Sequence, residues 1–304
     1  MIQVDNILLA RDFSSVSDQA LRYALYLAQE SGATLHLFYA DVLHEDPFDA
    51  YSSEGPVEEQ IRHRLLTGPE GAQIEPEGFA VETAMERDVA AAPAILNYAA
   101  DHDVDIIVAG THGRRGVHRI LLGSVAEEIV RRADCPVLTV REPEGATTEL
   151  DGNVSSILVP IDFSKHAREA LRYAREIGAI YDAEIHLLHV VEENLHPAFY
   201  VGGVGSIYDV QPDIDEKAST ELQKFFDKTD GPAIENVSTH VATGRAARKI
   251  TSFAESEAVD LLVMSTHGLT GLEHFFLGSV AEKVVRRSPI PVFTVKSFGK
   301  SLLQ

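Results

Sequence analysis

The sequence predicts an α/β protein built from two tandem domains, each a five-stranded parallel sheet with helices on both faces. Two observations lead to this fold class. The second half of the chain repeats the first, and within each copy short apolar, strand-like runs alternate with amphipathic, helix-like segments. Strands that alternate with helices are typical of parallel sheets, whose two faces are both covered.

The repeat establishes the organisation of the chain. Residues 107–140 match residues 262–295 at an offset of 155, and 18 of those 34 positions are identical. Residues 7–41 match residues 157–191 at an offset of 150, with 13 of 35 identical. Self-similarity of this length indicates two copies of one structural unit.

The boundary between the copies is polar and lacks apolar periodicity. It contains Pro143, Gly145 and Gly152, residues that are typical of a linker. A length of 304 residues also suits two domains of about 150 residues each. We therefore predict a first domain over 1–142, a linker over 143–154 and a second domain over 155–304.

The elements of the first copy can be placed in order. Ser14 is a suitable N-cap for the first helix, and Gly32 a suitable end. Further helices are expected over 57–66, around 93–100 and over 125–132. Strands are expected over 6–10, 34–40, 79–83, 106–109 and 135–140, and the second copy restarts at residue 156.

Composition narrows the classes of partner. The net charge is -21: residues 1–150 carry 11 basic and 26 acidic side chains, and residues 151–304 carry 15 and 21. This balance opposes non-specific binding to nucleic acid or anionic lipid. No run of about 18 apolar residues indicates membrane insertion. The single cysteine, Cys135, excludes an intrachain disulfide and fits a reducing compartment, so we expect a cytoplasmic protein.

A glycine-rich turn predicts an anion site in each copy. In the first copy the buried run 106–109 leads directly to Gly110, and Gly123 with Ser124 then opens an amphipathic helix. Glycines let a ligand approach the backbone, and a helix N-terminus offers unpaired N–H groups and a positive dipole end. The second copy repeats the pattern, with Ser265 in place of the first glycine.

Both copies resemble the universal stress protein family, whose ATP-binding members carry the motif G-x2-G-x9-G-S/T. The resemblance spans nearly the whole chain, and the long fixed spacing occurs twice. It implies a Rossmann-like or flavodoxin-like sheet of order 3-2-1-4-5, with the ligand at the switch point between strands one and four. The implied ligand is ATP, ADP or AMP, with Mg²⁺ accompanying the nucleotide.

The resemblance also carries the nucleotide-binding positions onto this chain. It implies contacts to the adenosine end from Asp12 and Ala40 in the first copy, and from Asp162 and Val190 in the second. The implied phosphate-binding residues are Gly110, His112, Gly113, Gly123, Ser124 and Val125 in the first copy, and Ser265, His267, Gly268, Gly278, Ser279 and Val280 in the second. The sequence predicts no catalytic residue and no dedicated metal site. The carboxylates of Asp12 and Asp162 are expected to hold the ribose or base, or a magnesium ion.

The same residues also have alternative, purely structural interpretations. Asp12 and Asp162 are suitable caps for the first helix of each copy, and the glycines of the motif are suitable for tight packing. We favour a loop-shaping role for His112 and His267, because no nucleophile or carboxylate dyad accompanies them.

Two further segments carry expectations of their own. We expect Arg11 to pair with an acidic neighbour rather than with phosphate. Residues 192–215, a glycine- and tyrosine-containing insertion in the second copy, are interpreted as a lid, a loose loop or a dimer contact.

The function expected from the resemblance is regulation of stress survival by a protein that binds ATP or AMP mainly through its first copy. The alternative is a nucleotide-free interaction scaffold, and slow ATP hydrolysis ranks below both because no base is visible. We also expect the last strands, 137–140 and 292–295, to pair within the chain as a built-in pseudo-dimer. Two such chains are then expected to form a homodimer.

Overall fold

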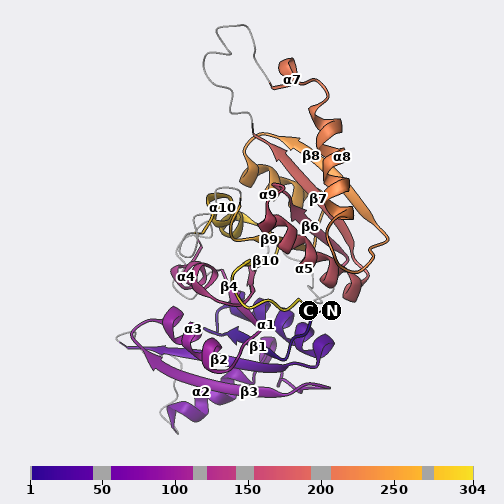
Figure 1. Ribbon diagram of the computed structural model, residues 1–304. Coiled ribbons are helices and arrows are strands. Elements are labelled where there is room, and N and C mark those ends of the chain that lie inside the picture. The colour runs from indigo at the N-terminus through magenta and orange to yellow at the C-terminus, as the bar shows by residue number, and fades with distance from the viewer. Residues whose placement is uncertain are drawn as a thin grey trace. The chain divides into compact units, whose positions relative to one another are not determined.

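The computed structural model describes residues 2–43, 56–111, 122–141, 154–192, 207–268 and 277–303. The chain forms two compact units. Unit 1 contains Met1–Asn153 together with Val285–Gln304, and unit 2 contains Val154–Val284. Figure 1 follows the chain from its first residue in indigo to its last in yellow.

The sheet of unit 1 has five parallel strands in the order β3-β2-β1-β4-β5, which confirms the expected order. β3 starts two residues later than expected and is longer, because β2 runs on to Val42 and pairs with β3 as far as Asp88. The strands are β1 (Asn6–Ala10), β2 (Thr34–Val42), β3 (Val81–Asp88), β4 (Ile106–Gly110) and β5 (Val137–Val140).

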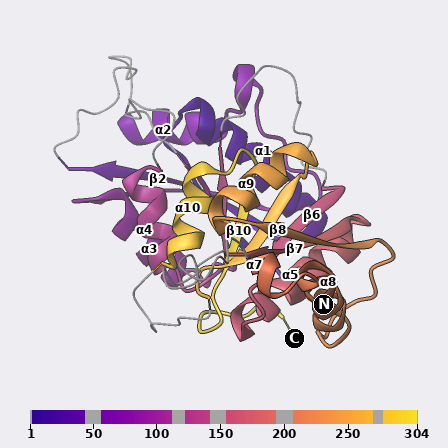
Figure 2. The same cartoon turned by 90° about the horizontal axis from the view of Figure 1, so that it is seen from above.

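Helices cover both faces of this sheet. α1 packs on β1 and β4, α2 on β2 and β3, and α3 on β2, β3 and α4. Right-handed crossovers place α1 and α2 on one face and α3 and α4 on the other, as Figure 2 shows. The helices are α1 (Ser15–Ser31), α2 (Val57–Leu65), α3 (Ala91–Asp101) and α4 (Ser124–Arg132), with a short 3-10 helix, η1, at Pro69–Gly71.

The ends of α1 are as the sequence predicts. The Ser14 hydroxyl accepts a hydrogen bond from the backbone N–H of Ser17 at 3.2 Å, and Gly32 has φ of +70°, a left-handed conformation that favours glycine. In the second copy Ser164 caps the matching helix in the same way, but its left-handed C-terminal residue is Asp182.

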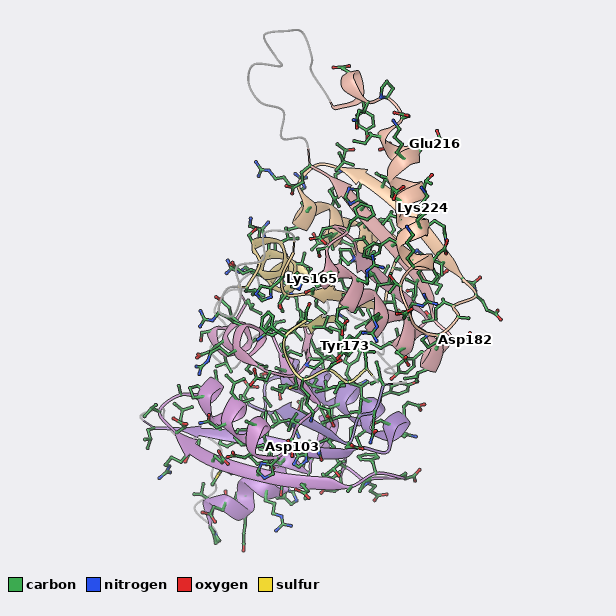
Figure 3. The ribbon with its side chains drawn as sticks, viewed as in Figure 1. Asp103, Lys165, Tyr173, Asp182, Glu216 and Lys224 are labelled. Carbon is green, nitrogen blue, oxygen red and sulfur yellow. The ribbon has the colours of Figure 1, made fainter. Side chains whose placement is uncertain are left out.

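Unit 2 repeats the arrangement, with strands in the order β9-β6-β7-β8. α5 packs on β6 and β9, α8 on β8, and α9 on β7. Figure 3 labels Tyr173, a fully buried side chain of α5. The elements are β6 (Ser156–Pro160), α5 (Lys165–Tyr181), β7 (Glu184–Val191), α7 (Ile207–Val210), α8 (Ile214–Asp227), β8 (Val237–Thr243), α9 (Ala246–Ser256), β9 (Leu261–Ser265) and α10 (Ser279–Arg287), whose last three residues belong to unit 1.

The last strand of the second copy, β10 (Val292–Val295), lies in unit 1 and pairs antiparallel with β5. The Thr139 hydroxyl donates to the carbonyl of Val292 at 3.2 Å, and the Thr294 hydroxyl donates to the carbonyl of Val137 at 3.1 Å. The expected pairing of the two last strands is therefore confirmed, and it adds an antiparallel strand to the sheet of unit 1.

Some expectations fall partly outside the described residues. They concern the linker, of which only Val154 is described, and residues 193–206 of the insertion in the second copy. In the described part of that insertion, the Tyr208 hydroxyl donates to Asp215 at 2.8 Å and hydrogen-bonds the Thr243 hydroxyl at 2.5 Å.

Candidate functional site

The carboxyl ends of β1 and β4 lie side by side in unit 1, because Ala10 pairs with Ala109. Asp12 follows β1, and Gly110 ends β4. The Thr111 N–H donates to the carbonyl of Val140 at 2.8 Å, and the Gly123 N–H donates to the carbonyl of Thr111 at 2.7 Å. Those two bonds bring the start of α4 beside the end of β4.

The N-terminus of α4 differs from that of α1. Its N-cap is Gly123, so no cap side chain accepts from the first-turn amides, whereas Ser14 does so in α1. Ser124 is exposed and Val125 half-buried at this end. The first-turn N–H groups of a helix have no partner within it, and the dipole there attracts anions. His112 and Gly113, the remaining predicted members, lie outside the described residues.

Asp12 shapes the loop between β1 and α1. Its Oδ1 accepts hydrogen bonds from the Ser14 N–H at 3.0 Å and from the Ser14 hydroxyl at 2.6 Å, while Phe13 between them has φ of +63°. The N-cap of α1 is Ser14. The alternative role of Asp12 as the helix cap is therefore wrong.

Arg11 is buried and bound to α1 and to the segment that ends α2. Its Nη2 donates to Asp18, and its Nη1 donates to the carbonyls of Leu65 at 2.9 Å and Thr67 at 3.0 Å. Burial lowers the pKa of the Arg11 guanidinium, and the charge of Asp18 opposes that shift. The predicted pairing with an acidic neighbour is confirmed.

Unit 2 shows how closely the aspartate and the glycine turn approach. Asp162 Oδ1 accepts from the Ser164 N–H at 3.0 Å, so Asp162, like Asp12, is not the helix cap. A β-carbon on Gly268 would lie 2.7 Å from Asp162 Oδ2. A β-carbon on Gly278 would lie 3.0 Å from the carbonyl oxygen of Thr266, to which the Gly278 N–H donates at 2.8 Å.

The turn of unit 2 also satisfies some of its own polar groups. Ser265 is buried, and its hydroxyl accepts from the His267 N–H at 3.2 Å. The Thr266 hydroxyl hydrogen-bonds His267 Nδ1 at 2.9 Å, and the His166 and His267 ring centroids are 6.0 Å apart. These interactions connect His267 to Ser265, Thr266 and His166.

The other predicted positions lie at the same edges of the two sheets. Ala40 and Val190 are half-buried near the ends of β2 and β7, and Val190 pairs with Ala242. Ser279, exposed, and Val280, half-buried, begin α10 directly after Gly278. The described members of each predicted site therefore belong to loops and element ends on one side of their unit.

Sequence reasoning missed two aspartates at the opposite edges. Asp105 Oδ2 accepts from the N–H groups of Asp5 at 2.7 Å and Asn6 at 2.9 Å, joining the start of β1 to β4. Asp260 does the same for β6 and β9, accepting from Ser155 and Ser156, both at 2.9 Å. Asp105 and Asp260 are separated by the repeat offset of 155, and this correspondence could have identified them from the sequence.

In the part of the chain that the structure describes, no helix is long and apolar enough to cross a membrane. The same residues contain no group of three or more His, Cys, Asp or Glu side chains that could hold a metal ion. Burial raises the pKa of the Cys135 thiol to about 12, so this residue is a packing thiol rather than a nucleophile.

Comparison with known proteins supports the family resemblance. The model of the universal stress protein family matches residues 3–141 and again 153–296. A universal stress protein of Methanocaldococcus jannaschii is 34% identical over 140 residues, 46% of this chain and 81% of its own. One from Synechocystis is 22% identical over 312 residues, covering 96% of this chain and 99% of its own.

A solved structure gives the same fold over the full length. The crystal structure of a universal stress protein from Archaeoglobus fulgidus superimposes with a TM-score of 0.63 at 24% identity, covering 97% of this chain and 99% of that one. Since the family model accounts for most of both repeats, the chain belongs to the universal stress protein family and contains two of its domains in tandem.

Proposed function

We propose that this protein binds an adenine nucleotide, ATP, ADP or AMP, at the carboxyl ends of β1 and β4 and acts as a regulator of stress survival. The supporting observation is the start of α4, where Gly123 leaves the first-turn amides without a side-chain cap and is held beside the end of β4. An anionic group suits such a helix start. In this proposal Asp12 and Ala40 contact the adenosine end, and Gly110, His112, Gly113, Gly123, Ser124 and Val125 contact the phosphates.

Mg²⁺ is proposed to accompany the nucleotide. In unit 2 the Asp162 carboxylate touches the glycine turn, since a β-carbon on Gly268 would lie 2.7 Å from its Oδ2. In this proposal the phosphates lie across the same turn, and a shared divalent cation makes the nearby carboxylate compatible with them. Mg²⁺ commonly keeps several waters and takes one or two carboxylates together with substrate phosphates.

The two units are proposed to differ in affinity. In unit 2 the Ser265 hydroxyl accepts the His267 N–H, which removes one backbone donor from the turn. In unit 1 the matching residue is Gly110, which has no side chain to do this. We therefore assign the tighter site to unit 1 and a weaker one to Asp162, Val190, Ser265, His267, Gly268, Gly278, Ser279 and Val280 of unit 2.

Calorimetric titration of nucleotide-stripped protein with ATP and Mg²⁺ tests the proposal. Wild type, Gly123→Val and Gly278→Val are compared, because each valine obstructs one helix start. Loss of the tight site in Gly123→Val alone supports binding in unit 1. Saturation at 100 times the dissociation constant should also raise the stability of the unit that binds nucleotide by about 2.7 kcal/mol in a thermal melt.

A nucleotide-free interaction scaffold is the second candidate function. The net charge of -21 favours it, because the field of an acidic protein repels polyphosphates, and Arg11 is committed to Asp18 and to carbonyls. Absence of heat and of a melting shift in stripped wild type would favour the scaffold. ATP turnover that persists in an Asp12→Ala, Gly123→Val variant would come from elsewhere in the sample.

A further inference from the structure

Unit 1 includes a segment that the second repeat encodes. Residues 285–304 contain Arg286, Arg287, Lys296 and Lys300 and no acidic residue, a charge of +4, whereas residues 1–150 carry a net charge of -15. Residues 1–153 contain no lysine, so this segment supplies both lysines of unit 1. A basic segment is therefore packed into an acidic unit.

Lys296 caps the C-terminal end of α4. Its Nζ donates to the carbonyl of Arg131 at 2.7 Å and to the carbonyl of Ala133 at 2.7 Å. The last carbonyls of a helix have no partner within it, and an ammonium group complements the negative end of the dipole. The side chain is half-buried, and burial lowers the pKa of Lys296 to about 8, so the amine is mostly charged at neutral pH.

The other end of α4 is the proposed phosphate-binding end. α4 has only nine residues, a length at which a helix depends on its tertiary contacts. Gly123 is held to Thr111, and Thr111 to Val140 of β5, by backbone hydrogen bonds. β10 in turn pairs with β5 through Val292–Thr294. The C-terminal segment thus supports one end of α4 through the sheet and the other end through Lys296.

We propose that Lys296 is a positioning residue for the nucleotide site of unit 1, which holds α4 so that Gly123 and Ser124 present their N–H groups to the phosphates. The inference rests on the proposed function. It makes the affinity of the first repeat depend on a side chain at the end of the second, without any contact between that side chain and the ligand.

Lys300 provides a matched control. It lies in the same segment and carries the same charge, but its Nζ is 2.7 Å from Asp105 Oδ1 and donates to the carbonyl of Asp103 at 2.6 Å. Those partners lie just before β4, at the edge of the sheet opposite the glycine turn. Removing Lys300 therefore takes one cation from unit 1 without uncapping α4.

The test combines hydrogen exchange and titration in the full chain. Lys296→Met, Lys296→Gln, Lys296→Arg and Lys300→Met are made in the Gly278→Val background, so that the heat of ATP–Mg²⁺ binding reports unit 1. In Lys296→Met and Lys296→Gln we expect amide exchange over residues 122–134 to become about tenfold faster and the affinity for ATP to fall about threefold or more. Lys296→Arg should restore both quantities, and Lys300→Met should change neither.

Each contrary result has a distinct meaning. Unchanged amide exchange over residues 122–134 in Lys296→Met and Lys296→Gln overturns the capping role, whether or not the affinity for ATP changes. Faster exchange with unchanged affinity overturns the positioning role and leaves a structural cap. A Gly278→Val parent that binds no nucleotide, with unmodified wild type equally silent, contradicts the proposed function and the positioning role with it.

Discussion

Gly268 and Gly278 occupy positions at which a β-carbon would meet a neighbouring oxygen. At Gly278 the obstacle is the backbone carbonyl of Thr266, at 3.0 Å, which cannot move without moving the turn. At Gly268 it is the side chain of Asp162, at 2.7 Å. Since neither glycine has its φ in the left-handed region, close approach rather than backbone conformation is what these positions require.

Gly268→Ala should therefore destabilise unit 2 by about 1 kcal/mol or less in urea unfolding, because the obstacle is the end of a side chain that can rotate away rather than backbone. The cost should fall in an Asp162→Ala background, because the contacting oxygen is gone. A double-mutant cycle should give a coupling energy of about 0.5 kcal/mol or more. Equal costs in both backgrounds would show that the contact with Asp162 does not limit the size of residue 268.

Ser265→Gly should strengthen nucleotide binding in unit 2, because it releases the His267 N–H and makes the motif complete. A hydrogen bond is worth about 0.5–1.5 kcal/mol net, so we expect about a twofold to tenfold gain in calorimetric affinity. Ser265→Ala, which removes the hydroxyl but keeps the β-carbon, separates the donor effect from the space effect. A gain in neither variant would contradict this role of Ser265.

Each sheet is also held together at the edge where its strands begin. Asp105 is buried, and its carboxylate accepts from two consecutive amides of the β1 entry and pairs with Lys300. Asp260 accepts from the N–H groups of Ser155 and Ser156 at the start of β6 in the same way, but Asp260 is half-buried. These carboxylates fix how the central strands of each unit start relative to one another.

Asp105→Ala should cost about 1–3 kcal/mol of unfolding free energy, because it removes the buried carboxylate that accepts from the Asp5 and Asn6 N–H groups and pairs with Lys300. The matched Asp260→Ala should cost less, since water can replace a half-buried carboxylate. Urea unfolding of the two variants, followed by hydrogen exchange in β1 and β6, measures both. A larger cost for Asp260→Ala would contradict the burial argument.

At the scale of the whole molecule, the repeat in the sequence and the compact units do not coincide. The second repeat ends with β10, but β10 and the residues after it pack in unit 1, where Ile2 and Leu303 form a bridge. The proposed site of the first repeat therefore includes support from the last residues of the chain.

This arrangement predicts a pH dependence. Burial lowers the pKa of Lys296 from 10.5 to about 8, so between these values the unfolded chain binds more protons than the folded one. The unfolding free energy of wild type relative to Lys296→Met should be constant below about pH 8 and should rise between about pH 8 and 10.5. Chemical unfolding across this range, with Lys300→Met as the control, measures the difference, and a flat profile would contradict it.

Local pattern was sufficient for much of the fold. The limits of β1 and the caps of α1 at Ser14 and Gly32 follow from apolar periodicity and turn chemistry, whereas the strand order of unit 1 was implied by the family resemblance. The sequence also predicted that Arg11 pairs with an acidic neighbour, which is Asp18. It did not predict the hydrogen bonds from Arg11 to the carbonyls of residues 64–67. These features depend on residues close in sequence or on rules of chain connection.

By itself, the sequence determined the family, the two repeats and the glycine motif, because repetition and spacing are properties of the chain. Only the tertiary structure decided three features: the hydrogen bonds of Asp105 and Asp260 to the amides at the starts of β1 and β6, the approach of Asp162 to Gly268, and the packing of Lys296 against α4. Each joins residues more than 90 positions apart, and the partner of a polar side chain at such a separation is set by how the sheet assembles rather than by any local period.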